Sequence, residues 1–240
     1  MIAQLSNRIA QPSQESHFLA DFLAFLDYIR THQVRITTLK HHIPLRHLKD
    51  LACLMRGREP FHPLQADGSF EMRCQRDQRR IDFMDMLATH MDLIGRSEMG
   101  YILPLTDRNL FVGRDPDGQA REIWRAYWTM DWNSLYPWME VVDQLVLHRP
   151  ELLRALAESP AAKKIPLNGL SPKLLGSDSM QQGFFWVVIR PLEYLGLAES
   201  YFAKDAEGFW SPVAFAIKQD LTTFLLDTPK AKPDTPTRSW

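Results

Sequence analysis

The stretch Glu199-Ser-Tyr-Phe-Ala-Lys-Asp-Ala-Glu-Gly-Phe-Trp-Ser-Pro-Val-Ala214 is the clearest structural signal in this 240-residue chain. Two aromatic-rich arms flank residues 205–208, which are of the types that form turns. The sequence therefore predicts a β-hairpin. Before it, apolar residues at helical spacing predict a helix capped by Ser177 or Asp178 and kinked at Pro191. This helix ends at Leu195-Gly-Leu197, and a short helix over Lys218–Leu226 is expected after the hairpin.

The same order occurs about a hundred residues earlier. Apolar residues predict a helix from Asp77 to Ile94, ending at Leu93-Ile-Gly95. A short β-like segment follows at Gly100–Thr106, then one turn of helix at Asp107–Val112. We expect a turn at Asp115-Pro-Asp-Gly118.

Two further helices are predicted near the start of the chain. The first begins after an N-cap at Ser16 and continues to Thr31, and the short β-branched segment Val34–Thr38 follows it. The second begins at Ile43-Pro44, with Leu45, Leu48 and Leu51 on its buried face.

The middle of the chain is helical and rich in tryptophan. Residues 120–132 predict one helix on which Trp124, Trp128 and Trp132 form a stripe at spacing four. Residues 138–148 and 150–158 continue the helical pattern.

These patterns predict a mainly α fold with small β-hairpins, in which two winged-helix-like units are joined by a Trp-rich helical segment. The expected boundaries are a lead-in at 1–15, a first unit at 16–118, a helical connector at 119–166, a second unit at 167–227 and a disordered tail at 228–240. One irregular helical domain with a terminal hairpin is the alternative.

The segments Val34-Arg-Ile-Thr-Thr38, Ile43-Pro44, Leu93-Ile94 and Leu103-Pro-Leu-Thr106, with the Trp-rich helix, resemble a group of poorly characterised bacterial proteins. In that group, tandem winged helices carry the pattern "LT-x-x-G-x-(I/L)-P", then "GL(I/V)", a hairpin ending in "LT" and a helix with tryptophans. Similar units accompany XPB-type helicases. His41-His42 stands where the pattern has glycine. The resemblance implies a fold and a connection with DNA transactions, and no catalytic residues.

The composition bounds the class of protein. The chain has 28 Lys and Arg against 29 Asp and Glu. This near-neutral balance argues against non-specific binding of nucleic acid, which depends on an excess of positive charge. Two cysteines, no signal-peptide pattern and no long apolar run predict a soluble cytoplasmic protein that no membrane anchors.

A local basic cluster is the exception to this neutral balance. The residues that we expect to bind double-stranded DNA are Arg35, Lys40, Arg46, His47, Lys49 and Arg56. Arg46, His47 and Lys49 should project away from the leucine face and meet a major groove. An ordinary solvated helix face is the alternative, and Asp50 would sit badly against phosphates. A second basic cluster at residues 73–80 could extend this patch. It is interleaved with acidic residues, so a network of ion pairs is an equally good interpretation.

Other chemistry finds little support. The histidines and cysteines between 41 and 74 have no zinc-finger spacing, and we expect no metal or cofactor. Asp82 and Asp85 share a helix face without a catalytic motif, so we expect no enzyme activity.

Aromatic residues supply the candidate partner-binding surface: Trp124, Trp128, Phe209 and Trp210. The tryptophan stripe could equally be core or a seam between units. Our leading hypothesis is a non-enzymatic winged-helix module that binds a macromolecule, with DNA slightly favoured. The alternative is a protein–protein scaffold or accessory subunit of a larger complex.

Overall fold

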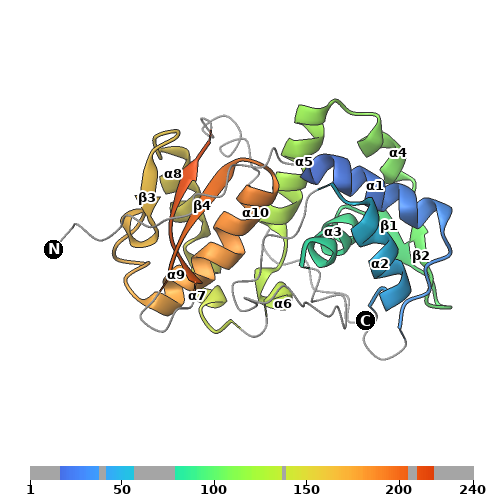
Figure 1. Cartoon of the computed structure of the whole chain (residues 1–240), viewed down its shortest axis with the longest axis horizontal. Helices are drawn as coiled ribbons and strands as arrows, with labels where there is room; N and C mark the ends of the chain where they lie inside the picture. Colours follow the sequence, from blue (N-terminus) through green and yellow to red (C-terminus); the bar gives the residue numbers. More distant parts are fainter. Residues whose placement is uncertain (1–16, 38–41, 57–78, 137–138, 205–209, 219–240) are drawn as a thin grey trace. The chain divides into compact units, whose positions relative to one another are not determined.

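The computed structural model describes residues 17–37, 42–56, 79–136, 139–204 and 210–218. Over these residues the protein is mainly helical with two small antiparallel sheets, which confirms the predicted class (Figure 1). The chain divides into two compact units. We call the described residues from His17 to Met130 the N-unit and those from Asp131 to Lys218 the C-unit.

The N-unit contains the following elements: α1 (Phe18–Thr31), α2 (Leu45–Leu54), α3 (Arg79–His90), β1 (Ile94–Arg96), β2 (Ile102–Pro104), α4 (Asp107–Val112) and α5 (Pro116–Thr129). Strands β1 and β2 form an antiparallel hairpin. On the other edge of β2, Arg35 forms an isolated antiparallel bridge with Tyr101. The Ile36 N–H donates to Gly100 O at 2.8 Å, so the segment after α1 pairs with the last strand of the hairpin.

Aromatic side chains form the N-unit core. Phe22 of α1 meets Phe111 of α4 edge to face at 5.7 Å, and Phe83 of α3 meets Tyr127 of α5 at 5.2 Å. Such edge-to-face pairs stabilise a core beyond the area that they bury. Helix α1 therefore contributes its apolar stripe to a core that four helices share.

A buried ion pair joins three separate segments of this unit. Asp21 is 1% exposed and accepts from the Arg80 guanidinium at 2.8 Å and from the Arg56 N–H at 2.7 Å. Buried charges are tolerated where they are paired and hydrogen-bonded. Asp21 thus ties the end of α2 and the start of α3 to the first turn of α1.

The C-unit contains the following elements: α6 (Trp132–Leu135), α7 (Val142–Leu147), α8 (Arg149–Ala157), β3 (Lys164–Pro166), η2 (Leu167–Gly169), α9 (Asp178–Phe184), η3 (Phe185–Ile189), α10 (Arg190–Tyr194), β4 (Ala198–Lys204) and β5 (Trp210–Ile217). The sheet order is β3-β5-β4, and all pairs are antiparallel. The predicted hairpin is confirmed, with Ala198 opposite Ile217 and Lys204 opposite Trp210. Figure 1 shows the helix that contains α9 and α10 running beside this sheet.

The predicted interruption of the long helix takes the form of a π-helical segment. Pro191 lacks an N–H and its ring clashes with the carbonyl four residues earlier. The segment η3 directly precedes α10, in which Pro191 is the second residue. A wider i to i+5 turn accommodates the proline without ending the helix.

Both long helices end in the same way before their hairpins. In the N-unit Asp92 adopts a φ of +53°, and the Leu93 N–H donates to Ala88 O at 2.9 Å. In the C-unit Gly196 adopts a φ of +74°, and the Leu197 N–H donates to Leu192 O at 2.8 Å. This is the Schellman arrangement, with a left-handed residue just beyond the helix.

Several sequence predictions are wrong. Residues 115–118 do not form a separate turn: Asp115 caps α5, and its carboxylate accepts from the Gly118 N–H at 2.9 Å. The tryptophan stripe is broken, because α5 ends at Thr129 and Trp132 begins α6 in the other unit. The predicted connector at 119–166 divides between the two units. The lead-in, the tail and the helix expected after Lys218 lie outside the described residues.

Candidate interaction surfaces

The basic side chains of α2 do not form one continuous row. Arg46, Lys49 and Arg56 are exposed. However, Arg46 lies in the first turn of α2 and Arg56 lies two residues beyond its last residue, Leu54, so the two stand at opposite ends of the helix. Asp50 is also exposed and lies one turn after Arg46 on the same side. A carboxylate therefore interrupts the surface that we expected to face phosphates.

His47 is not on the exposed side of α2, contrary to the prediction. Its side chain is 8% exposed, whereas Leu45 is 37% exposed. His47 precedes Leu51 by four residues, so the two share the face that packs on α1. Because Leu45 in the first turn is apolar, the sequence analysis placed it on the buried face and therefore placed His47 on the exposed side.

Four side chains form a directed hydrogen-bond chain between α1 and α2. Arg46 Nε donates to His47 Nε2 at 3.2 Å, and an arginine can only donate. His47 Nδ1 therefore carries the ring proton and donates to the Tyr28 hydroxyl at 2.8 Å. The Tyr28 hydroxyl in turn donates to Asp50 Oδ2 at 3.1 Å. We call Arg46, His47, Tyr28 and Asp50 the α1–α2 relay.

The environment of the relay shifts two of its pKa values. Burial, with the Arg46 charge beside it, lowers the pKa of His47 below its ordinary value of 6.5. Burial, with the hydrogen bond to Asp50, raises the pKa of Tyr28 to about 12. Both shifts favour the neutral form of the two rings. The relay is thus assembled from a neutral imidazole and a neutral phenol between two charged ends.

The remaining predicted DNA contacts are scattered. Arg35 is exposed on the bridged segment, with its guanidinium 5.9 Å from the centre of the Tyr101 ring. Lys40 lies outside the described residues, as do Arg73 and Arg76. Arg80 is buried on Asp21, so it contributes no surface charge.

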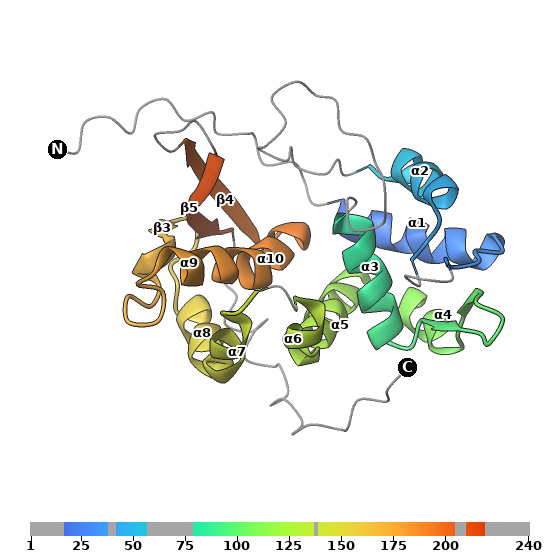
Figure 2. The same cartoon turned by 90° about the horizontal axis from the view of Figure 1, so that it is seen from below.

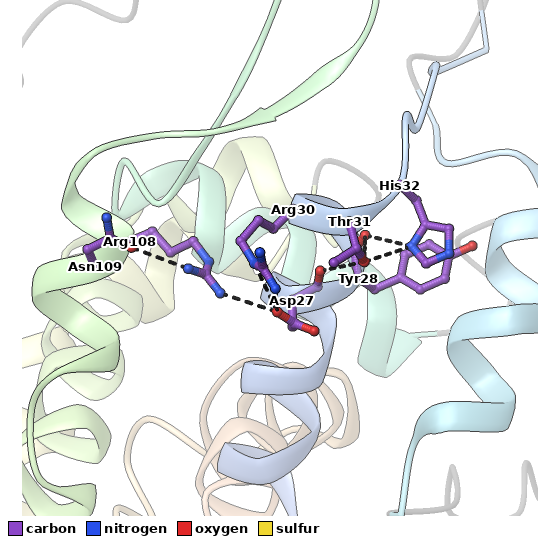
Figure 3. Close-up of polar contacts among 7 residues, drawn as sticks. All are labelled: Asp27, Tyr28, Arg30, Thr31, His32, Arg108 and Asn109. Atoms are coloured by element: carbon purple, nitrogen blue, oxygen red, sulfur yellow. Dashed lines mark hydrogen bonds and ion pairs between the residues drawn. The ribbon is translucent and has the colours of Figure 1, made fainter.

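A further cation, Arg108, is held within the N-unit. Figure 3 shows Asp27 of α1 between Arg30, at 2.7 Å, and Arg108 of α4, at 3.7 Å. The same view shows His32 stacked on Tyr28, with ring centres 3.9 Å apart. These contacts tie α4 to α1 and cover one side of the Tyr28 ring.

The helix before each hairpin is covered by another helix of its own unit. No side chain of α3 between Arg80 and Thr89 is fully exposed, and α5 packs against it (Figure 2). In the C-unit no side chain from Met180 to Tyr194 is fully exposed. There α7 packs against α9, and a Cβ on Gly183 would lie 2.3 Å from Val141 Cγ2. A helix that reads a DNA groove needs exposed polar side chains along its length, and in these helices they occur only at the ends: Arg79, His90, Asp178 and Ser179.

The predicted aromatic partner-binding surface is also corrected. Trp124 is 0% and Trp128 3% exposed, with ring centres 5.0 Å apart, so neither presents an open ring. Period-four spacing placed them on the inward face of α5. Phe209 lies outside the described residues, and of Trp210 only the backbone is described, in β5.

The sequence analysis missed an exposed apolar segment in the N-unit. Among the described residues, eight large apolar side chains are exposed, and five of them lie between residues 99 and 112. We call this set the 99–112 apolar surface: Met99, Leu103, Leu105, Leu110 and Val112. Leu103 is opposite Gly95, above which the Leu105 side chain lies, so both leucines occupy the outer face of the hairpin. The strand and helix here are too short for periodicity to reveal which side faces solvent.

In the parts of the chain that the structure describes, no group of three His, Cys, Asp or Glu side chains could hold a metal ion. No described helix is long and apolar enough to cross a membrane. Comparison with known protein families, curated proteins and solved structures finds no match to this chain.

Proposed function

We propose that this chain is a non-enzymatic module of two winged-helix-like units that binds a protein partner. Part of each unit follows the order helix, extended segment, helix, helix, strand, strand: α1 to β2 in the N-unit and α8 to β5 in the C-unit, where η2 is the second helix. The extended segment is the bridged residue Arg35 in the N-unit and β3 in the C-unit, and each pairs beside the last strand of its hairpin. This order and pairing support the winged-helix assignment for both units. In each, an additional helix covers the helix that would enter a DNA groove.

The covering of α3 and α9 is the observation that carries the choice of a protein partner. With α3 and α9 enclosed along most of their length, the units expose few of the side chains that direct readout requires. The N-unit instead exposes the five apolar side chains of the 99–112 apolar surface, of which Leu103 and Leu105 share one face of the hairpin, and exposed apolar patches are typical of protein-binding sites.

The test is a pull-down from the native host that compares three forms of the chain. Leu103→Gln/Leu105→Gln/Leu110→Gln should lose a stoichiometric partner that the wild type retains. Leu147→Gln changes the most exposed leucine of the C-unit, 75% exposed, and should retain it. No stoichiometric partner, or one that the triple variant keeps, would count against the proposal.

DNA is the second candidate, because Arg35, Arg46, Lys49 and Arg56 are all exposed. Duplex DNA should then bind more weakly at higher salt, and Arg46→Ala/Lys49→Ala should weaken it further. Arg154→Ala/Lys173→Ala removes the same charge from exposed C-unit positions and serves as the control. Absence of binding at low salt, or equal loss in both variants, eliminates this candidate.

A further inference from the structure

The α1–α2 relay consists wholly of titratable side chains, and its hydrogen bonds have a defined proton order. Each of its three hydrogen bonds depends on the proton position in the next. Nε2 of His47 must be free of a proton to accept from Arg46. The relay can therefore exist in this form only while His47 is neutral.

We propose that His47 is a proton-sensitive latch that holds the first turn of α2 on α1 at neutral pH and releases it in acid. A second ring proton would sit on Nε2, which faces the Arg46 guanidinium 3.2 Å away. Two cations would then meet at a site where the imidazole is 8% exposed. Arg46 is exposed but the imidazole is buried, so the charged ring regains water and escapes the guanidinium by leaving its place beside α1, which breaks its hydrogen bond to Tyr28.

The charges that face His47 come from both helices. From α2, Arg46 opposes a charged imidazole and Asp50 favours it; His32, the residue that follows α1, opposes it. Tyr28 of α1 accepts from the ring but carries no charge at neutral pH, since its pKa is about 12. Asp50 reaches His47 only through the Tyr28 hydroxyl, so no carboxylate contacts the ring directly in this set.

The direction of the pH effect follows from these contacts. The folded state lowers the pKa of His47, so the unfolded state binds more protons as the pH falls. The stabilisation from the latch is complete above the ordinary histidine pKa of about 6.5 and is lost as the pH falls from there through the lower pKa of the folded state.

NMR spectroscopy of the full chain tests the latch directly. At pH 7.5 the ¹⁵N shifts of His47 should show the Nδ1–H tautomer, and the ring should titrate below 6.5. As the ring titrates, amide protection in α2, corrected for intrinsic exchange, should fall while that of α8 stays unchanged. The Nε2–H tautomer, or titration at or above 6.5, would overturn the proposal.

Two variants separate a latch from a passive buried histidine. Arg46→Met removes the opposing cation and should raise the pKa of His47, and it should keep α2 protected to lower pH. His47→Gln should make the protection of α2 independent of pH between 5.5 and 7.5. If His47→Gln does not fold, the Arg46→Met titration alone decides, and an unchanged His47 pKa there contradicts the latch.

Discussion

The N-unit and the C-unit place their hairpins after the same kind of helix end, but they use different residues to do so. The N-unit puts Asp92 in the left-handed position and the C-unit puts Gly196 there. In both, the next carbonyl accepts from the end of the hairpin: Leu105 N–H to Leu93 O, and Lys218 N–H to Leu197 O. The corner between helix and sheet is thus a backbone geometry that either residue can satisfy.

The two units differ more in how their helices meet. The N-unit joins α1, α2 and α3 through the buried Asp21–Arg80 pair. The C-unit brings α9 close to Val141 and Leu145 through the missing side chain of Gly183. The contact among α1, α2 and α3 therefore depends on charge complementarity and the contact of α7 with α9 on close packing, which predicts different sensitivities to mutation at the two places.

The largest effect is expected from Asp21→Ala. It leaves Arg80 buried without its carboxylate and should lower the free energy of unfolding by about 3–5 kcal/mol. Urea unfolding measures the loss, and hydrogen exchange should locate it in α1 and α3. Asp21→Leu/Arg80→Met should recover most of the stability, because it removes both charges. A loss below about 1 kcal/mol in the single variant would show that the pair is not a main support of the N-unit.

Gly183→Ala should have the next largest effect. The new methyl group would overlap Val141, and overpacking costs about 1–3 kcal/mol. The loss should appear in hydrogen exchange of α9. Val141→Ala in the same chain should relieve part of it, so the double variant is less destabilised than the sum of the singles. Strict additivity would contradict close packing at this point.

The smallest effects should come from exchanging the left-handed residues. Gly196→Ala places a Cβ at a φ of +74° and should cost about 1 kcal/mol. Asp92→Gly relieves the same strain in the N-unit and should stabilise it by a few tenths of a kcal/mol or more. Changes in the urea midpoint of the same sign for both variants would mean that the two corners are not equivalent.

Local patterns in the sequence predicted most helices and the longer hairpin. The arms of β4 and β5 are aromatic-rich and separated by turn residues, and these signals act within a few residues of one another. By contrast, β1 and β3 were missed. Each is three residues long, and β3 exists because it pairs with β5, about fifty residues later. Pairing at that distance leaves no periodic signature in the strand itself.

The candidate sites were harder to predict for the same reason. Basic residue types marked α2 as a surface, but whether Arg46 meets phosphate or His47 depends on where α1 lies. The indole rings of α5 could bind a partner or fill a core. Because α5 packs on α3, both rings are buried in the core. The residue type limits the roles that a side chain could have, and its burial in the folded protein determines which of them it has.

The sequence by itself determined the mainly helical class, the hairpin from β4 to β5 and the near-neutral charge, because periodicity, turn chemistry and composition are local or additive properties. The tertiary structure alone decided that α3 and α9 are covered, that His47 faces Tyr28 and that Asp21 and Arg80 pair. These features join residues up to 59 positions apart. They arise from the competition among apolar faces for one core, which no single segment encodes.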